Sequence, residues 1–240
     1  MINRMSPNFK PINFNHPPPP YVVAPIATPH VLDAHRGAGA APDCDLLEFR
    51  IDGLLEAGDR VGIAMAESPV PTLLTVRRPD EGGLAPGLDT PQRIALYRAH
   101  LASASLIDIE SRSLEDLAEV VSEAAAEGVG VVASMHDFEG MPSQERIGAA
   151  ISAAAAAGAC VFKLAATPRD MPETMELVGL LCRPWPLAMA VMGMGAFGRI
   201  SRLMAIRAGS ALNYGYLLAP NAQGQWPAAQ LRSLARDLFE

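Results

Sequence analysis

The feature that most limits the fold of this 240-residue chain is a regular alternation of short apolar runs with longer helical stretches. Short apolar runs of this kind are typical of buried strands. They predict strands at residues 21–27, 45–51, 72–77, 105–110, 130–134, 160–165, 187–192 and 209–214. The stretches between them predict helices at residues 31–41, 53–65, 91–103, 114–127, 143–157, 171–183, 199–208 and 227–239.

Strands that alternate with helices pair in parallel, because their connections are too long for hairpins. A doubly wound open sheet is the competing architecture. The chain, however, has about the length of one (β/α)8 barrel, and no Gly-x-Gly-x-x-Gly motif follows the first run. The sequence therefore predicts an α/β fold in the form of a closed (β/α)8, or TIM, barrel that makes a single domain.

Several helix ends carry recognisable signals. Thr90 places a capping hydroxyl before a proline, which suits the first turn of a helix. Asp170 and Glu173 have the spacing of a capping box. Gly128 and Gly158 suit the left-handed position that follows a helix. These signals fix where the predicted helices begin and end.

Residues 1–20 predict a disordered, proline-rich tail, because the run from Pro17 to Pro20 can join neither a helix nor a central strand. The barrel domain is then expected over residues 21–240. The tail lacks the apolar segment of a signal peptide, and no apolar run reaches the roughly 18 residues of a transmembrane helix. We therefore expect a cytoplasmic protein without a membrane partner.

The net charge and the cysteine content indicate which partners and ligands to exclude. The formal net charge of −7 argues against a nucleic-acid partner, because affinity for phosphates needs an excess of lysine and arginine. Cys44, Cys160 and Cys182 lack the spacing of metal ligands. We expect them to be buried free thiols in a reducing compartment, and we expect no metal site.

One lysine stands out against the rest of the composition. Of 19 basic residues only Lys10 and Lys163 are lysines, and Lys163 lies inside the apolar run Cys160-Val-Phe-Lys-Leu-Ala165. Arginine stays protonated in proteins, whereas a desolvated amine can lose its proton and form an imine. The alternative is a lysine whose amine simply reaches solvent from the end of a strand.

In a (β/α)8 barrel the chemistry lies at the carboxyl ends of the strands and in the loops that follow. The unusual polar side chains of this chain gather at those places. They are Glu48, Arg50, Arg77, Glu81, Asp108, Glu110, His136, Asp137, Lys163, Arg199 and Arg202. On the second strand, Glu48 and Arg50 share one face while Leu47, Phe49 and Ile51 take the other.

Each of these residues also has a structural interpretation. Glu48 and Arg50 could form a buried ion pair, and Asp108 and Glu110 fit the polar packing of a barrel better than catalysis. The glycines from 193 to 198 suit phosphate binding or close packing equally well. A single histidine is more often structural than catalytic. Together, however, an imine-forming lysine, a histidine, carboxylates and arginines at one barrel mouth suit a small, anionic, carbonyl-bearing substrate.

Six segments of the sequence resemble those of a known family, the type I 3-dehydroquinate dehydratases. The similar segments follow one another in the family's order from about residue 21 to residue 230. They are Leu47-Glu-Phe-Arg-Ile-Asp52, Leu74-Thr-Val-Arg77 with Glu81-Gly-Gly83, Ser134-Met-His-Asp-Phe138 with Pro142-Ser143, the strand around Lys163, Met194-Gly-Ala-Phe-Gly-Arg-Ile-Ser-Arg202, and Gly224-Gln225. Any one of these segments is weak evidence for the resemblance, but six of them in the same order are strong evidence.

The resemblance implies a reaction, the conversion of 3-dehydroquinate to 3-dehydroshikimate and water, in aromatic biosynthesis or quinate breakdown. Lys163 would form a Schiff base with the C3 ketone. His136 would remove the C2 proton and then protonate the departing C1 hydroxyl, and Glu81 would orient His136. A protonated imine is itself an electron sink, so no metal or organic cofactor is implied.

The remaining matches imply substrate-binding roles. Arg202 and Gln225 would hold the substrate carboxylate, while Glu48, Arg50 and Arg77 would bind ring hydroxyls and support the pocket. The segment 219–225 would close over the substrate as a lid. The family is often dimeric, so a homodimer is the expected assembly.

The chain departs from the family pattern in several places. Met135 replaces a tyrosine, Ala24 a serine and Asn221 the serine of the closing loop, which also lacks its usual proline. The segment 53–71 is short. We expect the amide of Asn221 to keep the carboxylate contact. Two other functions stay open: a Schiff-base aldolase acting on a sugar phosphate, for which 209–215 is a faint phosphate loop, and a non-catalytic protein that binds a quinate-like ligand.

Overall fold

The structure, a computed structural model, describes residues 12, 14, 20–37 and 42–239. Its strands are β1 (Tyr21–Ile26), β2 (Leu46–Arg50), β3 (Thr72–Thr75), β4 (Leu106–Glu110), β5 (Gly130–Asp137), β6 (Val161–Ala166), β7 (Ala188–Gly193), β8 (Leu212–Tyr216) and β9 (Trp226–Pro227). Its α-helices are α1 (Pro29–Gly37), α2 (Asp59–Ala66), α3 (Thr90–His100), α4 (Ala118–Ala126), α5 (Gln144–Ala156), α6 (Met171–Gly179), α7 (Gly198–Arg207) and α8 (Ala228–Asp237).

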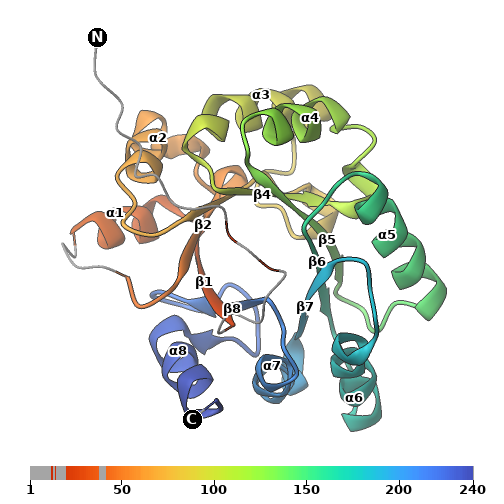
Figure 1. Ribbon diagram of the computed structural model, residues 1–240. Helices are drawn as coiled ribbons and strands as arrows, with labels where there is room; N and C mark the ends of the chain where they lie inside the picture. The colour runs from red at the N-terminus through yellow and green to blue at the C-terminus, as the bar shows by residue number, and fades with distance from the viewer. Residues whose placement is uncertain (1–11, 13, 15–19, 38–41, 240) are drawn as a thin grey trace.

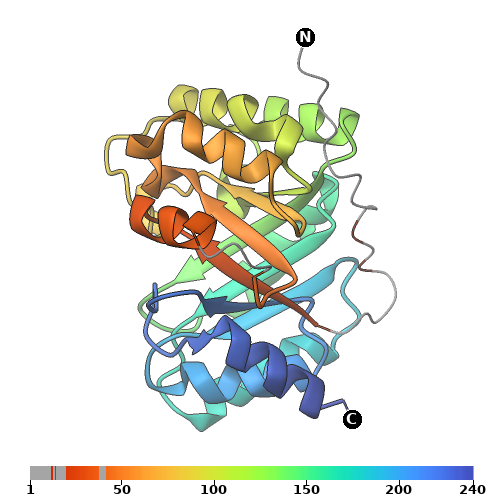
Figure 2. The same cartoon turned by 90° about the vertical axis from the view of Figure 1, so that its left-hand side faces the viewer.

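The strands pair in parallel in the order β7-β6-β5-β4-β3-β2-β1-β8-β9 and curl into a (β/α)8 barrel with the helices outside it (Figure 1). The barrel closes between β8 and β7, where the amide of Ala211, just before β8, donates to the carbonyl of Met189 in β7 at 2.8 Å. From the side, the strands run between the helices with their carboxyl ends at one end of the barrel (Figure 2). The barrel predicted from the sequence is therefore confirmed.

Inside the barrel, side chains of alternate strand positions form layers. At the amino ends of the strands the layer is apolar and consists of Val23, Leu46, Leu73, Leu106, Val132, Val161, Ala190 and Leu212. Two residues further along most strands the inward side chain is polar, because successive side chains of one face are two apart. The polar layer contains Glu48, Thr75, Asp108, Ser134, Lys163 and Tyr214. The apolar layer thus closes one end of the barrel and leaves polar groups facing the other.

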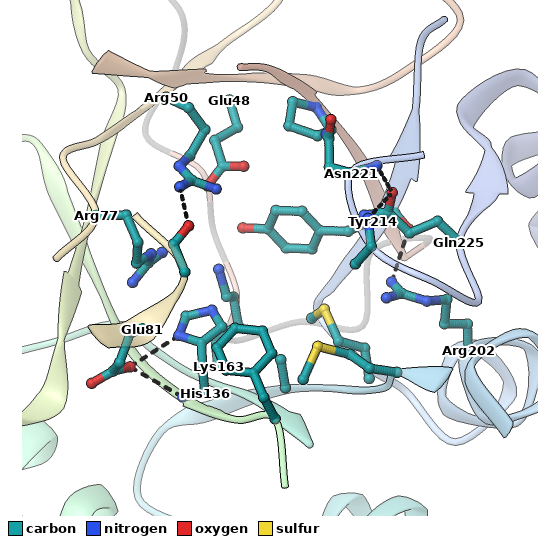
Figure 3. A pocket seen from close by; sticks show the side chains of 17 residues that line it. Glu48, Arg50, Arg77, Glu81, His136, Lys163, Arg202, Tyr214, Asn221 and Gln225 are labelled. Carbon is teal, nitrogen blue, oxygen red and sulfur yellow. Dashed lines mark hydrogen bonds and ion pairs between the residues drawn. The ribbon is translucent and has the colours of Figure 1, made fainter. Parts of the chain in front are cut away.

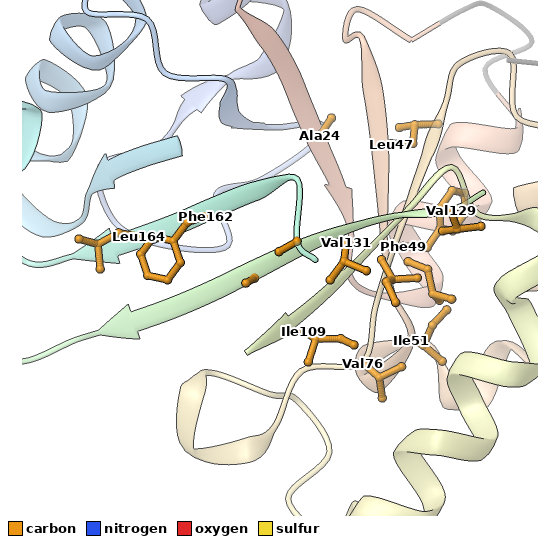
Figure 4. Packing of buried hydrophobic residues seen from close by; sticks show 14 of the residues in the cluster. Ala24, Leu47, Phe49, Ile51, Val76, Ile109, Val129, Val131, Phe162 and Leu164 are labelled. Atoms are coloured by element: carbon orange, nitrogen blue, oxygen red, sulfur yellow. The ribbon is translucent and has the colours of Figure 1, made fainter. Parts of the chain in front are cut away.

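The outward face of the same strands packs against the helices. Leu47 and Phe49 of β2, Val131 of β5, and Phe162 and Leu164 of β6 belong to one buried apolar cluster that runs between strands and helices (Figure 4). Strands buried on both faces need apolar residues on both, which is why the sequence shows nearly continuous apolar runs. The polar inward residues interrupt these runs, and they are the residues available for chemistry.

The tail predicted at 1–20 lies largely outside the described residues, and its disorder stays a prediction. Three of its residues are described. Ile12 and Phe14 pack against the apolar layer at the amino end of the barrel, and Pro20 is buried. The rings of Phe14 and Tyr21 meet edge to face at 5.8 Å between their centroids. These parts of the expected tail therefore cover the closed end of the barrel.

All eight predicted strands are present, with ends that differ from the predicted ones by up to three residues. Two of these differences bear on the site. β5 continues through Asp137, so His136 lies in the strand and not after it. β3 ends at Thr75, which places Arg77 just beyond the strand. The two-residue strand β9 was not predicted, because Trp226 and Pro227 form too short a run to show a pattern.

The helices also differ from expectation at some of their ends. Turns of 3-10 helix at Ile51–Gly53 and Leu55–Ala57 precede α2, which begins only at Asp59. The expected start of α4 at residue 114 is likewise wrong, because α4 begins at Ala118. α1 ends at Gly37, and residues 38–41 lie outside the described residues.

The cap of α3 is Asp89 and not Thr90. The carboxylate of Asp89 accepts from the amide of Gln92 at 2.9 Å, and the side chain of Gln92 accepts from the amide of Asp89. Asp170 does cap α6, accepting from the amide of Glu173 at 2.8 Å. Gly128 and Gly158 follow their helices at φ values of 72° and 78°, as predicted.

The three cysteines are free, but only Cys44 is buried; Cys160 is partly buried and Cys182 is exposed, so the expectation of buried thiols was wrong for Cys182. Among the described helices, none is long and apolar enough to cross a membrane.

Candidate active site

A pocket opens at the carboxyl ends of the strands, above the polar layer (Figure 3). Its lining includes all nine residues to which the family resemblance assigns a role, but not Asp108, Glu110, Asp137 or Arg199 of the wider set of polar residues. The nine are Glu48, Arg50, Arg77, Glu81, His136, Lys163, Arg202, Asn221 and Gln225. They come from six of the βα units and lie far apart in the sequence, so the fold alone brings them together. The prediction that they share one site is consistent with this placement.

The amine of Lys163 projects from β6 into the pocket and is almost completely buried, at 3% exposure of the residue. Its Nζ lies 2.8 Å from Oδ2 of Asp108 on β4. It also lies 4.5 Å from the centre of the Tyr214 ring, which forms one wall beside it. Lys163 therefore does not extend to solvent as a surface lysine would, and that structural alternative is wrong.

Asp108 links the lysine to a buried network of charges. Its Oδ1 pairs with Nη2 of Arg77 at 2.8 Å and accepts from the hydroxyl of Ser134 at 2.6 Å. Burial alone would raise the pKa of Asp108, but the facing charges of Arg77 and Lys163 outweigh it and hold the pKa well below its usual range. Asp108 is thus a buried carboxylate that fixes the position of the amine.

Arg77 lines the pocket, but its guanidinium is engaged in ion pairs and hydrogen bonds with neighbouring side chains. Its guanidinium pairs with Asp108 and, at 3.3 Å, with Glu110, and donates to Ser134 at 2.6 Å. Glu110 is held in turn by Arg93. The polar packing expected of Asp108 and Glu110 is therefore present, with the addition of the lysine contact.

His136 is paired with Glu81. Its Nδ1 lies 3.0 Å from Oε2 of Glu81, and its backbone amide donates to the same oxygen at 3.1 Å. A carboxylate only accepts hydrogen bonds, so the proton of the neutral ring belongs on Nδ1, and Nε2 keeps a free lone pair. Glu81 in turn pairs through Oε1 with Arg112 at 2.8 Å. The arrangement fixes both the tautomer and the direction of the imidazole.

The surroundings shift the pKa values of both His136 and Glu81. Burial, aided by the positive charges of Arg77 and Lys163, lowers the pKa of His136 well below 6.5. Burial raises the pKa of Glu81. The ring of Phe138 stacks on His136 with 6.4 Å between centroids and an interplanar angle of 16°. A neutral imidazole held between a carboxylate and an aromatic ring is suited to accept a proton.

Glu48 and Arg50 do not form the ion pair that was their structural alternative. Arg50 pairs with Asp52 through two nitrogens, at 3.1 and 2.8 Å, and donates to the carbonyl of Gly82 at 2.9 Å. Glu48 accepts from the hydroxyl of Thr75 at 2.9 Å. Both side chains are thereby fixed at the pocket wall, where they offer a carboxylate and a guanidinium to a ligand.

Arg202 is a buried cation on the opposite wall, at 3% exposure. It donates through Nη1 to the carbonyl of Tyr214 at 2.9 Å, while its Nε has no hydrogen-bond partner among the described residues. Within the same residues no carboxylate lies at ion-pair distance from it. Burial lowers the pKa of Arg202 to about 10, which still leaves it charged at neutral pH. An unpaired buried cation marks a place for an anionic ligand.

The loop after β8 reaches the pocket beside Arg202. Oε1 of Gln225 accepts from the amides of Asn221 and Ala222, at 2.8 and 3.3 Å, which closes a small turn. Gly224, at a φ of 84°, lies so close to α7 that a Cβ there would stand 2.7 Å from the Cα of Gly198. The end of the loop is therefore anchored, whereas Asn221 is exposed at its tip.

Close packing explains Gly193 and Gly198, and a φ of 69° explains Gly195. A Cβ on Gly193 would meet the Ser201 hydroxyl at 2.3 Å, and one on Gly198 would meet the backbone of Gly224 at 2.8 Å. The faint phosphate loop at 209–215 forms a turn and most of β8. Neither segment offers the open glycine loop that a phosphate site would need.

Three residues of the site were not recognised from the sequence as functional. Asp108 contacts the amine, Tyr214 lines the pocket beside it, and Arg112 supports Glu81 from outside. The alternation of inward positions places Asp108 and Tyr214 inside the barrel, since each follows an inward apolar residue by two, but it does not distinguish a functional side chain from a packed one. Arg112 lies in a turn of 3-10 helix, where no pattern predicts the direction of a side chain.

The fold and the site define a class of protein: a (β/α)8-barrel enzyme whose pocket joins a buried primary amine to a histidine–carboxylate pair. Comparisons with known proteins narrow the class. The model of the type I 3-dehydroquinase family matches residues 22–240. The chain belongs to this family.

Individual relatives agree with that assignment. The chain is 31% identical to the 3-dehydroquinate dehydratase of Methanocella arvoryzae over 216 residues, which cover 89% of this chain and 94% of that protein. It is 33% identical to the enzyme of that name from Halobacterium salinarum, over 84% of this chain and 92% of that one. The crystal structure of 3-dehydroquinate dehydratase from Geobacillus kaustophilus superimposes with a TM-score of 0.81 at 27% identity, covering 92% and 91% of the two chains.

Proposed function

We propose that this chain is a 3-dehydroquinate dehydratase, which converts 3-dehydroquinate to 3-dehydroshikimate and water through a Schiff base on Lys163. The observation that carries the proposal is the buried Nζ of Lys163 in a pocket whose wall bears the His136–Glu81 pair. Membership of the type I 3-dehydroquinase family supports the same substrate. A relative from Clostridium difficile, 25% identical with a TM-score of 0.79, is described as a type I 3-dehydroquinate dehydratase with covalently modified comenic acid.

The first step is attack of Lys163 on the C3 ketone, for which the ammonium first gives up a proton and becomes the neutral amine. The nitrogen forms a bond to C3, the carbonyl oxygen leaves as water, and a protonated imine remains. Asp108, 2.8 Å from Nζ, fixes the amine where the ketone must arrive. The positive imine is an electron sink for the carbanion that forms at C2.

His136 carries the proton in the next two steps. Its Nε2 takes a proton from C2, and the electron pair moves into the imine to give an enamine. The enamine then expels the C1 hydroxyl, which leaves as water with the proton that His136 returns. Water finally hydrolyses the imine and releases 3-dehydroshikimate. Glu81 holds Nδ1 throughout, at 3.0 Å, and stabilises the imidazolium while it exists.

The substrate carboxylate belongs beside Arg202. The guanidinium has an unpaired Nε and no carboxylate near it in the part of the chain that the structure describes, so an anion there would complete its hydrogen bonds. Gln225 and Asn221 line the pocket on the same side and would add amide donors. Bringing the carboxylate to this wall points the ring across the pocket toward Lys163.

The ring hydroxyls then face Glu48 and Arg50. Both side chains are fixed by neighbours, Thr75 and Asp52 respectively, so little conformational freedom is lost when a ligand binds. Arg77 is engaged by Asp108, Glu110 and Ser134 and acts mainly as support for the lysine side of the pocket. A homodimer, usual for the family, is part of the proposal and is tested by sedimentation of the purified protein.

The direct test is to incubate the protein with 3-dehydroquinate and follow the ultraviolet absorbance of the conjugated product. We expect turnover by the wild type and almost none by Lys163→Arg, which keeps the charge but cannot form an imine. A protein that is folded, binds 3-dehydroquinate and yet produces no absorbance change would refute the proposal and favour a non-catalytic binding function.

A further inference from the structure

Tyr214 is a buried tyrosine that lines the pocket. It projects from β8 into the pocket, and only 5% of the residue is exposed. Its Oη has no hydrogen-bond partner among the residues that the structure describes. In Figure 3 the ring lies beside Lys163 and the hydroxyl points into the pocket on the side of Glu48. Burial, aided by the charges of Glu48 and Asp108, raises the pKa of the phenol well above 10, so the hydroxyl stays neutral and can donate or accept.

A second buried tyrosine shows what a purely structural hydroxyl looks like in this barrel. Tyr97 is fully buried, and its Oη donates to the carbonyl of Asp108 at 2.6 Å and accepts from the amide of Val76 at 3.3 Å. Buried polar groups are normally paired in this way, because an unpaired one loses its hydration without compensation. Among the described residues Tyr214 departs from this rule, and it does so inside the pocket, where a ligand could supply the missing hydrogen bond.

The ring and the hydroxyl of Tyr214 have separable uses. The ring lies 4.5 Å from Nζ of Lys163, close enough for a cation–π contact with the ammonium. Phenylalanine would provide that contact, fill the same space and bury no unpaired oxygen. Packing therefore explains the presence of the ring but not that of the hydroxyl. A ligand with a polar group that enters the pocket would explain the hydroxyl.

We propose that Tyr214 is a specificity-determining residue whose hydroxyl forms a hydrogen bond with a secondary hydroxyl of the substrate ring, C4 or C5, on the Glu48 side of the pocket. The inference rests on the proposed function, because it takes 3-dehydroquinate as the ligand. With Lys163 at C3 and Arg202 at the carboxylate, the C4 and C5 hydroxyls are the polar groups that remain for this wall. A site that leaves a buried hydroxyl unpaired without its ligand discriminates strongly against analogues lacking the matching group.

The test compares Tyr214→Phe with wild type and uses Tyr97→Phe as the matched control. For 3-dehydroquinate we expect Tyr214→Phe to lower kcat/KM about 3- to 10-fold, the range of one hydrogen bond, with most of the change in KM. Without ligand its Tm should equal or exceed that of wild type, because an unpaired buried oxygen is removed. Tyr97→Phe should instead lower the Tm by several degrees, because two hydrogen bonds are lost.

Analogues of 3-dehydroquinate that lack the C4 or the C5 hydroxyl complete the experiment. For one of the two, wild type and Tyr214→Phe should have the same kcat/KM within about twofold, since the contact is already absent. Equal kcat/KM of the two proteins on 3-dehydroquinate itself would overturn the proposal, as would a Tm loss in Tyr214→Phe like that of Tyr97→Phe. Failure of wild type to dehydrate 3-dehydroquinate would instead refute the proposed function, so the two failures are distinguishable.

Discussion

At the scale of single residues, the carboxylate on one side of the His136 ring sets its tautomer, and burial with the cations around it lowers its pKa. Glu81 fixes the proton on Nδ1, and Nε2 is left to face the pocket. Lys163 offers a nucleophile but has no means of moving the C2 proton. The two side chains should therefore fail in different ways when each is removed.

We predict that His136→Ala loses turnover on the order of 10²–10⁴-fold, the usual contribution of a general acid–base catalyst. The variant should still form the covalent adduct with 3-dehydroquinate, because Lys163 is intact. Steady-state kinetics and mass spectrometry of the denatured protein measure the two properties separately. Turnover near the wild-type rate would mean that another group is the base.

The surroundings of His136 also predict how kcat/KM depends on pH on the acid side. Because burial and nearby positive charges lower the pKa of His136 below 6.5, the neutral base persists to lower pH than an exposed histidine would allow. We expect log kcat/KM to decline on the acid side only below pH 6.5, with an apparent pKa that belongs to the His136–Glu81 pair. Circular dichroism over the same range is the control for unfolding. A limb at or above pH 6.5 would contradict the burial argument.

Sequence and structure differ most at this scale. Lys163 and His136 could be predicted because residues of their kind are rare in apolar runs. The contact between Lys163 and Asp108 could not, since it joins side chains 55 residues apart and depends on which strand positions face each other. Tyr214 was missed because a tyrosine in an apolar strand is ordinarily packing, and only the missing partner of its hydroxyl distinguishes it.

At the scale of elements, helix and strand ends are decided by local hydrogen bonds that composition only partly reveals. The sequence placed the cap of α3 on Thr90, whereas Asp89 makes the reciprocal bonds of a capping box with Gln92. Both residues are good caps by type. What decides between them is backbone geometry, because Asp89 is extended, at φ −88° and ψ 173°, and Thr90 is already helical.

The capping bonds of Asp89 should contribute to the stability of the protein. Asp89→Ala should lower the free energy of unfolding by about 0.5–2 kcal/mol, the usual cost of losing such a cap. Thr90→Ala, its immediate neighbour, should change it by no more than about 0.5 kcal/mol. Urea unfolding of the two variants provides the comparison. Equal losses would show that the cap bond contributes little.

The loop 219–225 is the element that the family resemblance assigns as a lid over the substrate. Gln225 binds the amides of Asn221 and Ala222, so it shapes the loop as well as lining the pocket. We expect Asn221→Ser to keep catalytic efficiency within about tenfold, or about 1.4 kcal/mol. Gln225→Ala should raise KM more than it lowers kcat, because both the carboxylate contact and the loop turn are lost.

A ligand-bound crystal structure tests the lid separately from the kinetics. Closure would bring Asn221 and Gln225 to the substrate carboxylate and exclude water from the imine. A loop that stays open, with both amides far from the carboxylate, would show that 219–225 is an ordinary connection whose tip happens to border the pocket.

At the scale of the whole molecule, the barrel could be predicted because its pattern is repeated. Eight alternations of strand and helix admit few architectures, and errors of a few residues at the ends do not change the topology. The division of the barrel interior into an apolar and a polar layer was not anticipated. It follows from inward positions two apart, such as Val161 and Lys163, and it explains why a lysine can lie inside an apolar strand.

Reductive trapping during turnover tests most directly whether Lys163 forms a Schiff base with the substrate. Borohydride added to the protein with 3-dehydroquinate should attach one ligand-sized mass increment, and peptide mapping should locate it on Lys163. The only other lysine is Lys10, so the two positions are readily separated. Lys163→Arg should take up no label. Label on Lys10 alone, or none on a protein that is turning over substrate, would contradict the Schiff-base mechanism.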